Sequence, residues 1–122
     1  VEEETRVAHE APRIAGVFFN RLERRMRLKS DPTAMYHPEK VGQKPTPKDT
    51  RNAMNPHNTY THAGLPPGPI CAPGPDALKA VFFPEEHNYL FFVAARDGSG
   101  SHVFAVTGRE HMRNVNRHLR KR

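Results

Sequence analysis

Near the start of the chain, apolar residues recur at intervals of three and four, the spacing of one face of an amphipathic helix. The stripe consists of Ile14, Val17, Phe18, Leu22 and Met26. Pro12 precedes it and suits the first turn of a helix. The pattern therefore predicts a helix over residues 12–27 with this stripe against a core. The acidic residues 1–8 are interpreted as the end of a preceding helix.

Three further segments have the sequence of a helix start, in which Pro follows a capping or turn residue. Residues 30–33, Ser-Asp-Pro-Thr, predict a short helix that runs to Tyr36. Residues 46–49, Thr-Pro-Lys-Asp, predict another short turn or helix. Pro75 opens a longer helix, which Pro84 ends. The apolar residues on that helix are Leu78, Val81 and Phe82.

The last third of the chain predicts a β-hairpin followed by a helix. Residues 89–94, Tyr-Leu-Phe-Phe-Val-Ala, form a dense run typical of a strand. A turn sequence at 97–100 leads into a return strand at 102–105. Thr107 and Glu110 then fit a capping box and predict a final helix. Its expected inward residues are Met112, Val115 and Leu119.

This order of elements predicts an α+β fold: several helices packed with a β-hairpin or small antiparallel sheet. Residues 38–75 are poor in regular signals and rich in Pro and Gly, with Tyr60 and Leu65 among them. They predict a long ordered loop that binds a ligand. The length of 122 residues predicts a single domain over residues 1–122.

Charge and cysteine content narrow the function classes. Lys and Arg number 19 against 13 acidic residues, a net charge of +6 that favours anionic partners. Nine of the basic residues form two groups, which are also interpreted as solvated helix ends: Arg21, Arg24, Arg25, Arg27 and Lys29, and Arg117, Arg120, Lys121 and Arg122. The lone Cys71 excludes an internal disulfide. No apolar run is long enough to span a bilayer. Because the chain begins at Val1 rather than Met, we expect a piece of a longer protein.

The sequence contains no motif that is typical of metal or phosphate binding. None of the eight histidines forms a metalloprotease pair, and one cysteine cannot build a thiolate zinc site. Cys71 lies between Ile70 and Ala72 and is interpreted as a small buried apolar residue. The aromatics Phe91, Phe92 and Phe104 are interpreted as core rather than as a base-stacking platform. We expect no metal, no cofactor and no nucleic acid.

The acidic run Glu2, Glu3 and Glu4 is the first candidate for catalysis. On a helix, successive residues are rotated by about 100°, so the three carboxylates cannot share one pocket. A general acid needs an apolar wall, and Val1 and Val7 flank the run. The other interpretation of the run is a solvated N-terminal face.

Motifs along nearly the whole chain resemble the MltG/YceG-like endolytic murein transglycosylase family. They are Glu2-Glu3-Glu4-Thr5, Val17-Phe18-Phe19-Asn20-Arg21-Leu22, Leu28-Lys29-Ser30-Asp31-Pro32-Thr33, Asn58-Thr59-Tyr60, Gly64-Leu65-Pro66-Pro67-Gly68-Pro69-Ile70, Pro73-Gly74, Tyr89-Leu90-Phe91-Phe92-Val93 and His102-Val103-Phe104. Two positions depart from the family pattern: Glu3 replaces Lys, and His57 replaces the first Tyr of Tyr-Asn-Thr-Tyr. The segment from His37 to Asn55 matches only loosely.

The resemblance implies an enzyme that cuts the MurNAc–GlcNAc bond inside a glycan strand and leaves a 1,6-anhydroMurNAc end. It implies that Glu4 is the single acid/base, because the C6 hydroxyl of the sugar replaces the second carboxyl of ordinary glycosidases. Supporting roles fall to Glu2, Asn20 and His102. The implied substrate-binding residues are Ser30, Asp31, Thr33, Asn58, Tyr60, Leu65 and Pro66.

The resemblance also implies partners and a location. The partners are peptidoglycan glycan strands and the cell-wall synthesis machinery. The location is the cell envelope, on the extracytoplasmic side of the inner membrane, with an anchor and a wall-binding module upstream of residues 1–122. Two alternatives stay open: a non-catalytic basic module that binds wall polymer or nucleic acid, and a hydrolytic muramidase with Asp31 as second carboxylate.

Overall fold

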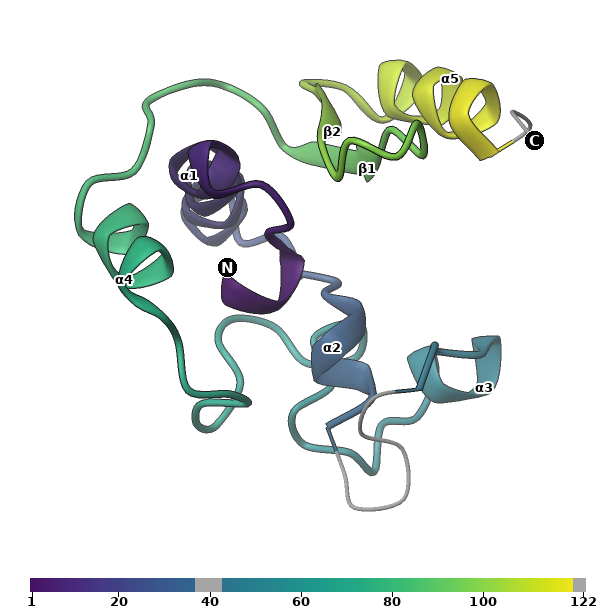
Figure 1. Cartoon of the computed structure of the whole chain (residues 1–122). Helices are drawn as coiled ribbons and strands as arrows, with labels where there is room; N and C mark the ends of the chain where they lie inside the picture. The colour runs from purple at the N-terminus through teal and green to yellow at the C-terminus, as the bar shows by residue number, and fades with distance from the viewer. Residues whose placement is uncertain (37–42, 120–122) are drawn as a thin grey trace. The chain divides into compact units, whose positions relative to one another are not determined.

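The computed structural model describes residues 1–36 and 43–119, and within them the fold is α+β, as predicted (Figure 1). The helices are α1 (Ala11–Glu23), α2 (Asp31–Ala34), α3 (Pro47–Thr50), α4 (Pro75–Phe82) and α5 (Gly108–Leu119), with 3-10 helices η1 (Glu2–Glu4) and η2 (Ala8–Glu10). The strands are β1 (Phe91–Ala94) and β2 (His102–Ala105). His37, Arg120, Lys121 and Arg122 lie outside the described residues.

The chain divides into two compact units. The hairpin unit consists of Val1–Asn20 together with the chain from Pro73 onward, and the loop unit consists of Arg21–Ala72. The prediction of a single domain over residues 1–122 stays a prediction. Among the described residues, no helix has both the length and the apolar composition needed to cross a membrane.

Small residues join α1 to α4 in the core of the hairpin unit. Ala11 and Ala15 of α1 and Ala80 of α4 form one buried cluster, and Val1 packs against it. Alanine side chains allow two helix backbones to approach closely. On α4 the larger apolar residues are exposed instead, with Phe82 76% exposed. The buried residues of this helix are therefore its alanines.

Helix α1 ends at Glu23, earlier than the predicted residue 27. Arg25 adopts a left-handed backbone with φ of 58°. The Met26 amide donates to the Arg21 carbonyl at 2.8 Å, and the Arg25 amide donates to the Leu22 carbonyl at 3.1 Å. These two bonds form a Schellman motif, which normally uses Gly at the left-handed position. Without a Gly there, the sequence pattern carried no stop signal.

Residues 1–10 do not form the predicted α-helical end. They fold as η1 and η2, separated by an extended Thr5 with φ −95° and ψ 123°. The Thr5 hydroxyl donates to the Val1 carbonyl at 2.7 Å. Because this hydroxyl competes with helical hydrogen bonding, the first turn closes locally instead of continuing.

The predicted hairpin is confirmed, with β1 antiparallel to β2 and Phe91 opposite Ala105. Helix α5 packs on both strands. The prediction that Met112 points inward is wrong, since this side chain is 54% exposed. The contact face instead begins at His111, whose ring stacks on Phe91 at 4.9 Å. His118 continues that face through a 3.0 Å bond to the Ala95 carbonyl.

The capping predictions have mixed outcomes. Thr46 and Asp49 form a complete capping box at α3. At α5, the Thr107 hydroxyl accepts from the Glu110 amide at 3.1 Å, but the Glu110 carboxylate reaches the amide of Val106. Ser30 occupies the cap position of α2, yet within the described residues its side chain makes no cap bond.

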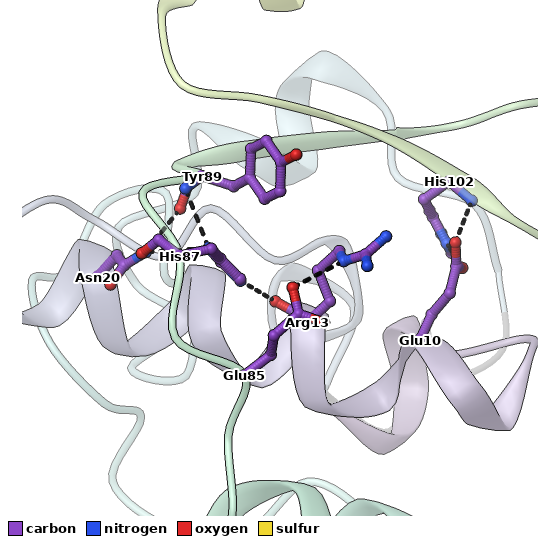
Figure 2. Close-up of polar contacts among 7 residues, drawn as sticks. All are labelled: Glu10, Arg13, Asn20, Glu85, His87, Tyr89 and His102. Carbon is purple, nitrogen blue, oxygen red and sulfur yellow. Dashed lines mark hydrogen bonds and ion pairs between the residues drawn. The ribbon is translucent and has the colours of Figure 1, made fainter.

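The segment that leads into β1 lies against α1 (Figure 2). The Asn20 amide donates to the carbonyls of His87 at 2.8 Å and Tyr89 at 3.0 Å. His87 Nδ1 accepts from the Tyr89 amide at 3.0 Å, while Nε2 lies 2.8 Å from the Arg13 carbonyl. An acceptor at Nδ1 places the ring proton on Nε2, so this histidine is a neutral Nε2–H tautomer.

Bonds from side chains to main-chain carbonyls also occur in the loop unit, where several polar side chains are buried. Asn58 is 0% exposed and Thr59 is 1% exposed. The Asn58 amide lies 3.2, 3.3 and 3.0 Å from the carbonyls of Asp49, Thr50 and Asn52. One buried amide therefore satisfies the main chain at the end of α3.

We predict that Gly16→Ala lowers the free energy of unfolding. An added Cβ would lie 2.5 Å from both the Glu85 carbonyl oxygen and His87 Nε2. Overpacking costs about 1–3 kcal/mol, which exceeds the roughly 1 kcal/mol gain in helix propensity. Thermal denaturation measures the effect. Gly68→Ala is the control, because nothing lies within 4 Å of an added Cβ there. An equal melting temperature for both variants would contradict the packing.

We also predict that Asn58→Ala destabilises the loop unit by about 1–3 kcal/mol, because the carbonyls of Asp49, Thr50 and Asn52 lose a donor. Denaturant unfolding measures the loss. Asn116→Ala is the matched control, since Asn116 is exposed on α5 and its replacement should change stability by less than about 0.5 kcal/mol. A loss at Asn58 no larger than that at Asn116 would show that this amide is dispensable.

Candidate active site

Three acids of the N-terminal segment have three different surroundings. Glu3 is exposed, whereas Glu2 and Glu4 are half-buried. Glu4 lies at the end of η1, and its amide donates to the Val1 carbonyl at 3.2 Å. Val1 itself packs on the alanine cluster between α1 and α4. Glu4 is thus connected to the apolar core through the turn that carries it.

Glu2 holds the start of α4. Its Oε1 accepts from the amide of Gly74 at 2.5 Å, and Gly74 is the N-cap residue of that helix. A carboxylate at this position also suits the positive end of the helix dipole. A Cβ on Gly74 would lie 3.0 Å from the same oxygen. The Pro-Gly motif at 73–74 therefore leaves room for Glu2, which has a structural role in this unit.

A buried pair, Glu10 and His102, connects the end of the N-terminal segment to β2 (Figure 2). Glu10 Oε1 lies 2.9 Å from His102 Nδ1, and Oε2 accepts from the His102 amide at 3.0 Å. The side chains are 8% and 6% exposed for His102 and Glu10. Phe92 packs edge-on against the imidazole at 5.3 Å. His102 was predicted as a supporting residue, whereas Glu10 was not singled out.

No sequence pattern marks Glu10 as special. It stands just before a predicted helix, where an acid ordinarily has a favourable interaction with the helix N-terminus. Its partner follows 92 residues later, after the hairpin turn. Pairing at that distance along the chain depends on the packing of the hairpin against the start of α1. Sequence periodicity does not contain that information.

Three predicted sugar-contact residues are buried in the loop unit. Asn58 is fully enclosed, and its Oδ1 accepts from the Tyr60 amide at 3.0 Å. The hydroxyls of Thr33 and Thr59 lie 2.7 Å apart, and the Thr59 hydroxyl accepts from the Ser30 amide at 2.9 Å. Ser30 is 8% exposed and Thr33 is 5% exposed. These residues fix the loop backbone, so in this structure their side chains offer little surface to a sugar.

The other predicted contact residues reach the surface of the loop unit. The Tyr60 hydroxyl donates to Asp31 Oδ1 at 2.5 Å. Asp31 is exposed and Tyr60 is half-buried. Leu65 is 72% exposed and Pro66 is half-buried. A carboxylate, a phenol ring and apolar groups are suited to sugar hydroxyls and ring faces.

His57 stands where the family pattern has Tyr. Its ring meets Tyr36 edge-on, with centroids 4.7 Å apart and planes at 60°. Its amide donates to Asn55 Oδ1 at 3.0 Å. The aromatic character of the position is kept, while the hydroxyl of a tyrosine is replaced by imidazole nitrogens.

Arg21 differs in environment from the predicted solvated helix end, and Arg13, which is outside that group, forms an ion pair. Arg21 is 8% exposed, and its guanidinium donates to the Arg27 carbonyl at 2.9 Å. Burial lowers the pKa of Arg21 from its ordinary value, although an arginine stays protonated in a protein. Arg13 pairs with Glu85 at 3.0 Å, and this hydrogen bond raises the pKa of Arg13. Arg21 is therefore part of the fold rather than of a basic surface.

Metal-binding geometry does not occur in the part of the chain that the structure describes, since no three His, Cys, Asp or Glu side chains gather there. Cys71 is half-buried rather than buried as predicted. Of the predicted residues, Glu2, Glu4, Asn20 and His102 belong to the hairpin unit. Ser30, Asp31, Thr33, Asn58, Tyr60, Leu65 and Pro66 belong to the loop unit.

Similar proteins cover nearly the whole chain. An endolytic murein transglycosylase of Bacillus subtilis (strain 168) is 38% identical over 111 residues, 91% of this chain and 30% of the relative. One from Streptococcus pneumoniae serotype 2 (strain D39) is 36% identical over 98% of this chain and 22% of the relative. This chain thus spans less than a third of the length of these curated relatives.

A solved structure agrees with these relatives. The crystal structure of the yceG-like protein lmo1499 from Listeria monocytogenes is 38% identical and superposes with a TM-score of 0.75. The alignment covers 93% of this chain and 34% of that chain. The model of the YceG-like family matches residues 1–117. This chain belongs to the YceG-like family.

Proposed function

We propose that this chain is the catalytic part of an endolytic murein transglycosylase, an enzyme that cuts peptidoglycan glycan strands. The observation that supports this most strongly is sequence identity of 36–38% to proteins of that name over 91–98% of the chain. The match to the family model over residues 1–117 includes the N-terminal acids and the loop unit. The substrate is peptidoglycan, and the bond cleaved joins MurNAc to GlcNAc.

Glu4 is the acid and the base of the proposed reaction. Its carboxylic acid protonates the glycosidic oxygen as the bond from MurNAc C1 breaks. The C6 hydroxyl of the same sugar attacks C1 and passes its proton to the Glu4 carboxylate. This restores the acid and leaves a 1,6-anhydroMurNAc end without water. One carboxyl group is enough because the sugar supplies the nucleophile that ordinary glycosidases take from water or a second carboxylate.

Glu2, Glu3 and Glu4 have different roles in this proposal because their surroundings differ. Glu2 is engaged with Gly74 at the start of α4. Glu3 is exposed, where water screens its charge. Glu4 is half-buried on a turn whose first residue, Val1, packs on the alanine cluster.

Sugar binding in the loop unit falls to the surface residues Asp31, Tyr60, Leu65 and Pro66. The bond from Tyr60 to Asp31 fixes both groups, so they present a preset arrangement to sugar hydroxyls. The buried residues Ser30, Thr33 and Asn58 act through the loop backbone. The net charge of +6 suits anionic wall polymers. The cell envelope outside the inner membrane is the proposed location, with the wall-synthesis machinery as a partner.

Replacing Glu4 with Gln is expected to abolish anhydroMurNAc ends, because the amide cannot donate or accept the proton. The measurement is mass spectrometry of purified peptidoglycan after incubation with each protein. Loss of general acid–base catalysis should lower the rate by about 100- to 10,000-fold. Glu3→Gln is the matched control and should keep its activity, since that side chain is exposed.

Other products would favour the alternatives. Reducing ends that vanish in Asp31→Asn would identify a hydrolytic muramidase. Retained product in Glu4→Gln would overturn the assignment of the acid. Wall binding that falls steeply with salt, with no cleavage by any variant, would favour a basic binding module.

Tyr60→Phe is expected to raise KM by roughly 3- to 10-fold with little change in kcat, because an exposed hydrogen bond contributes about 1 kcal/mol. The variant keeps the ring and removes the hydroxyl that donates to Asp31. Initial rates against glycan concentration measure the effect. Tyr36→Phe, in the same unit but outside the proposed contact set, is the control. A fall in kcat alone would place Tyr60 in the chemistry instead of in binding.

A further inference from the structure

The segment that carries Glu4 has little stability of its own. Residues 1–10 contain two three-residue 3-10 helices, and within them Glu10 is the buried residue. Helices this short do not persist in water without tertiary contacts. The position of the Glu4 carboxyl therefore depends on what the rest of the hairpin unit does to this segment.

The segment contacts the rest of the hairpin unit both before and after Glu4. Before it, Glu2 accepts from Gly74. After it, the hairpin turn meets Arg6 and Val7: a Cβ on Gly100 would lie 3.0 Å from Arg6 Cβ and 3.3 Å from Val7 Cγ2. Two residues beyond Gly100, His102 binds Glu10. The start of β2 and the turn before it thus support the chain that follows Glu4.

The Glu10–His102 pair is the strongest of these contacts in chemical terms. A buried carboxylate receives one N–H from the imidazole and one from the His102 main chain. Such charge-assisted bonds are about twice as strong as neutral ones. Removal of one partner would leave a buried charge unpaired, which is strongly unfavourable. The Nδ1–H donor is present in both the imidazolium and the Nδ1–H neutral form, so either can make this contact.

We propose that Glu10 and His102 are positioning residues that set the place of Glu4 by fixing the end of its segment to β2. This inference rests on the proposed function of Glu4. The pair acts through the segment and takes no part in proton transfer. Because a displacement of about 1 Å can lower a rate by roughly 100-fold, loss of the pair should reduce kcat and leave KM nearly unchanged.

Two substitutions of His102 separate positioning from bulk stability. In His102→Asn the side-chain amide nitrogen takes the place of Nδ1 and keeps the donor to Glu10. In His102→Gln the amide is near the Nε2 position, and the donor to Glu10 is lost. Both remove the ring that meets Phe92. We expect His102→Gln to lower kcat by 10- to 100-fold and His102→Asn by less than 5-fold, although Gln is closer to His in size.

A glycine pair tests the same support from the turn. Gly98 and Gly100 both have positive φ, 86° and 77°, so alanine is strained at either. An alanine at Gly100 alone would press on Arg6 and Val7, because nothing lies within 4 Å of an added Cβ at Gly98. We expect Gly100→Ala to reduce kcat more than Gly98→Ala at equal folded fraction.

The measurements are kcat, KM, melting temperature and amide hydrogen exchange of residues 1–10, in the protein with any flanking sequence retained. Equal kcat in His102→Gln and His102→Asn, or kcat changes that follow the folded fraction, would overturn the proposal. If the parent protein makes no anhydro ends, the proposed function fails. Amide hydrogen exchange then still tests whether the pair holds residues 1–10 in place. Faster exchange confined to residues 1–10 in His102→Gln would support it, and unchanged exchange would overturn it.

Discussion

Main-chain carbonyls outside helices and strands need hydrogen-bond donors, and in this protein side chains supply many of them. Asn20 bonds two carbonyls of the segment before β1. Asn58 does the same for the chain at the end of α3. A buried carbonyl without a donor costs a few kcal/mol, comparable with a large part of the stability of a small domain. These amides therefore make the long irregular segments compatible with a compact fold.

The same constraint explains why polar residues of the sequence motifs are buried. Asn58 and Thr33 look like ligand-binding residues because their side chains carry donors and acceptors, yet the loop backbone uses those atoms. Asp31 and Tyr60 differ because their bond to each other lies at the surface. In the loop unit, one set of polar residues builds the backbone conformation and a second set is presented by it.

Acidic residues are divided in a similar way in the hairpin unit. Glu2 is bonded at the start of α4 and Glu10 is bonded to His102, so both carboxylates are engaged in structure. Glu4 lies between them on a short turn. A catalytic carboxyl needs a fixed position, and fixed neighbours on either side supply it at low cost. The proposed chemistry thus depends on acids that take no part in it.

Sequence periodicity determined the element types, because the apolar spacing in α1 and the dense run in β1 arise from local backbone geometry. Family motifs likewise singled out Glu4 and the loop segments as candidates. The left-handed turn at Arg25 that follows the end of α1 is local, but no Gly marks it in the sequence. The exposure of Met112 and the partner of Glu10 were decided by tertiary structure. Each depends on atoms from distant parts of the chain, such as the carboxylate and imidazole of Glu10 and His102, 92 residues apart. Local patterns do not encode which distant surfaces pack together, because that choice minimises the free energy of the whole chain.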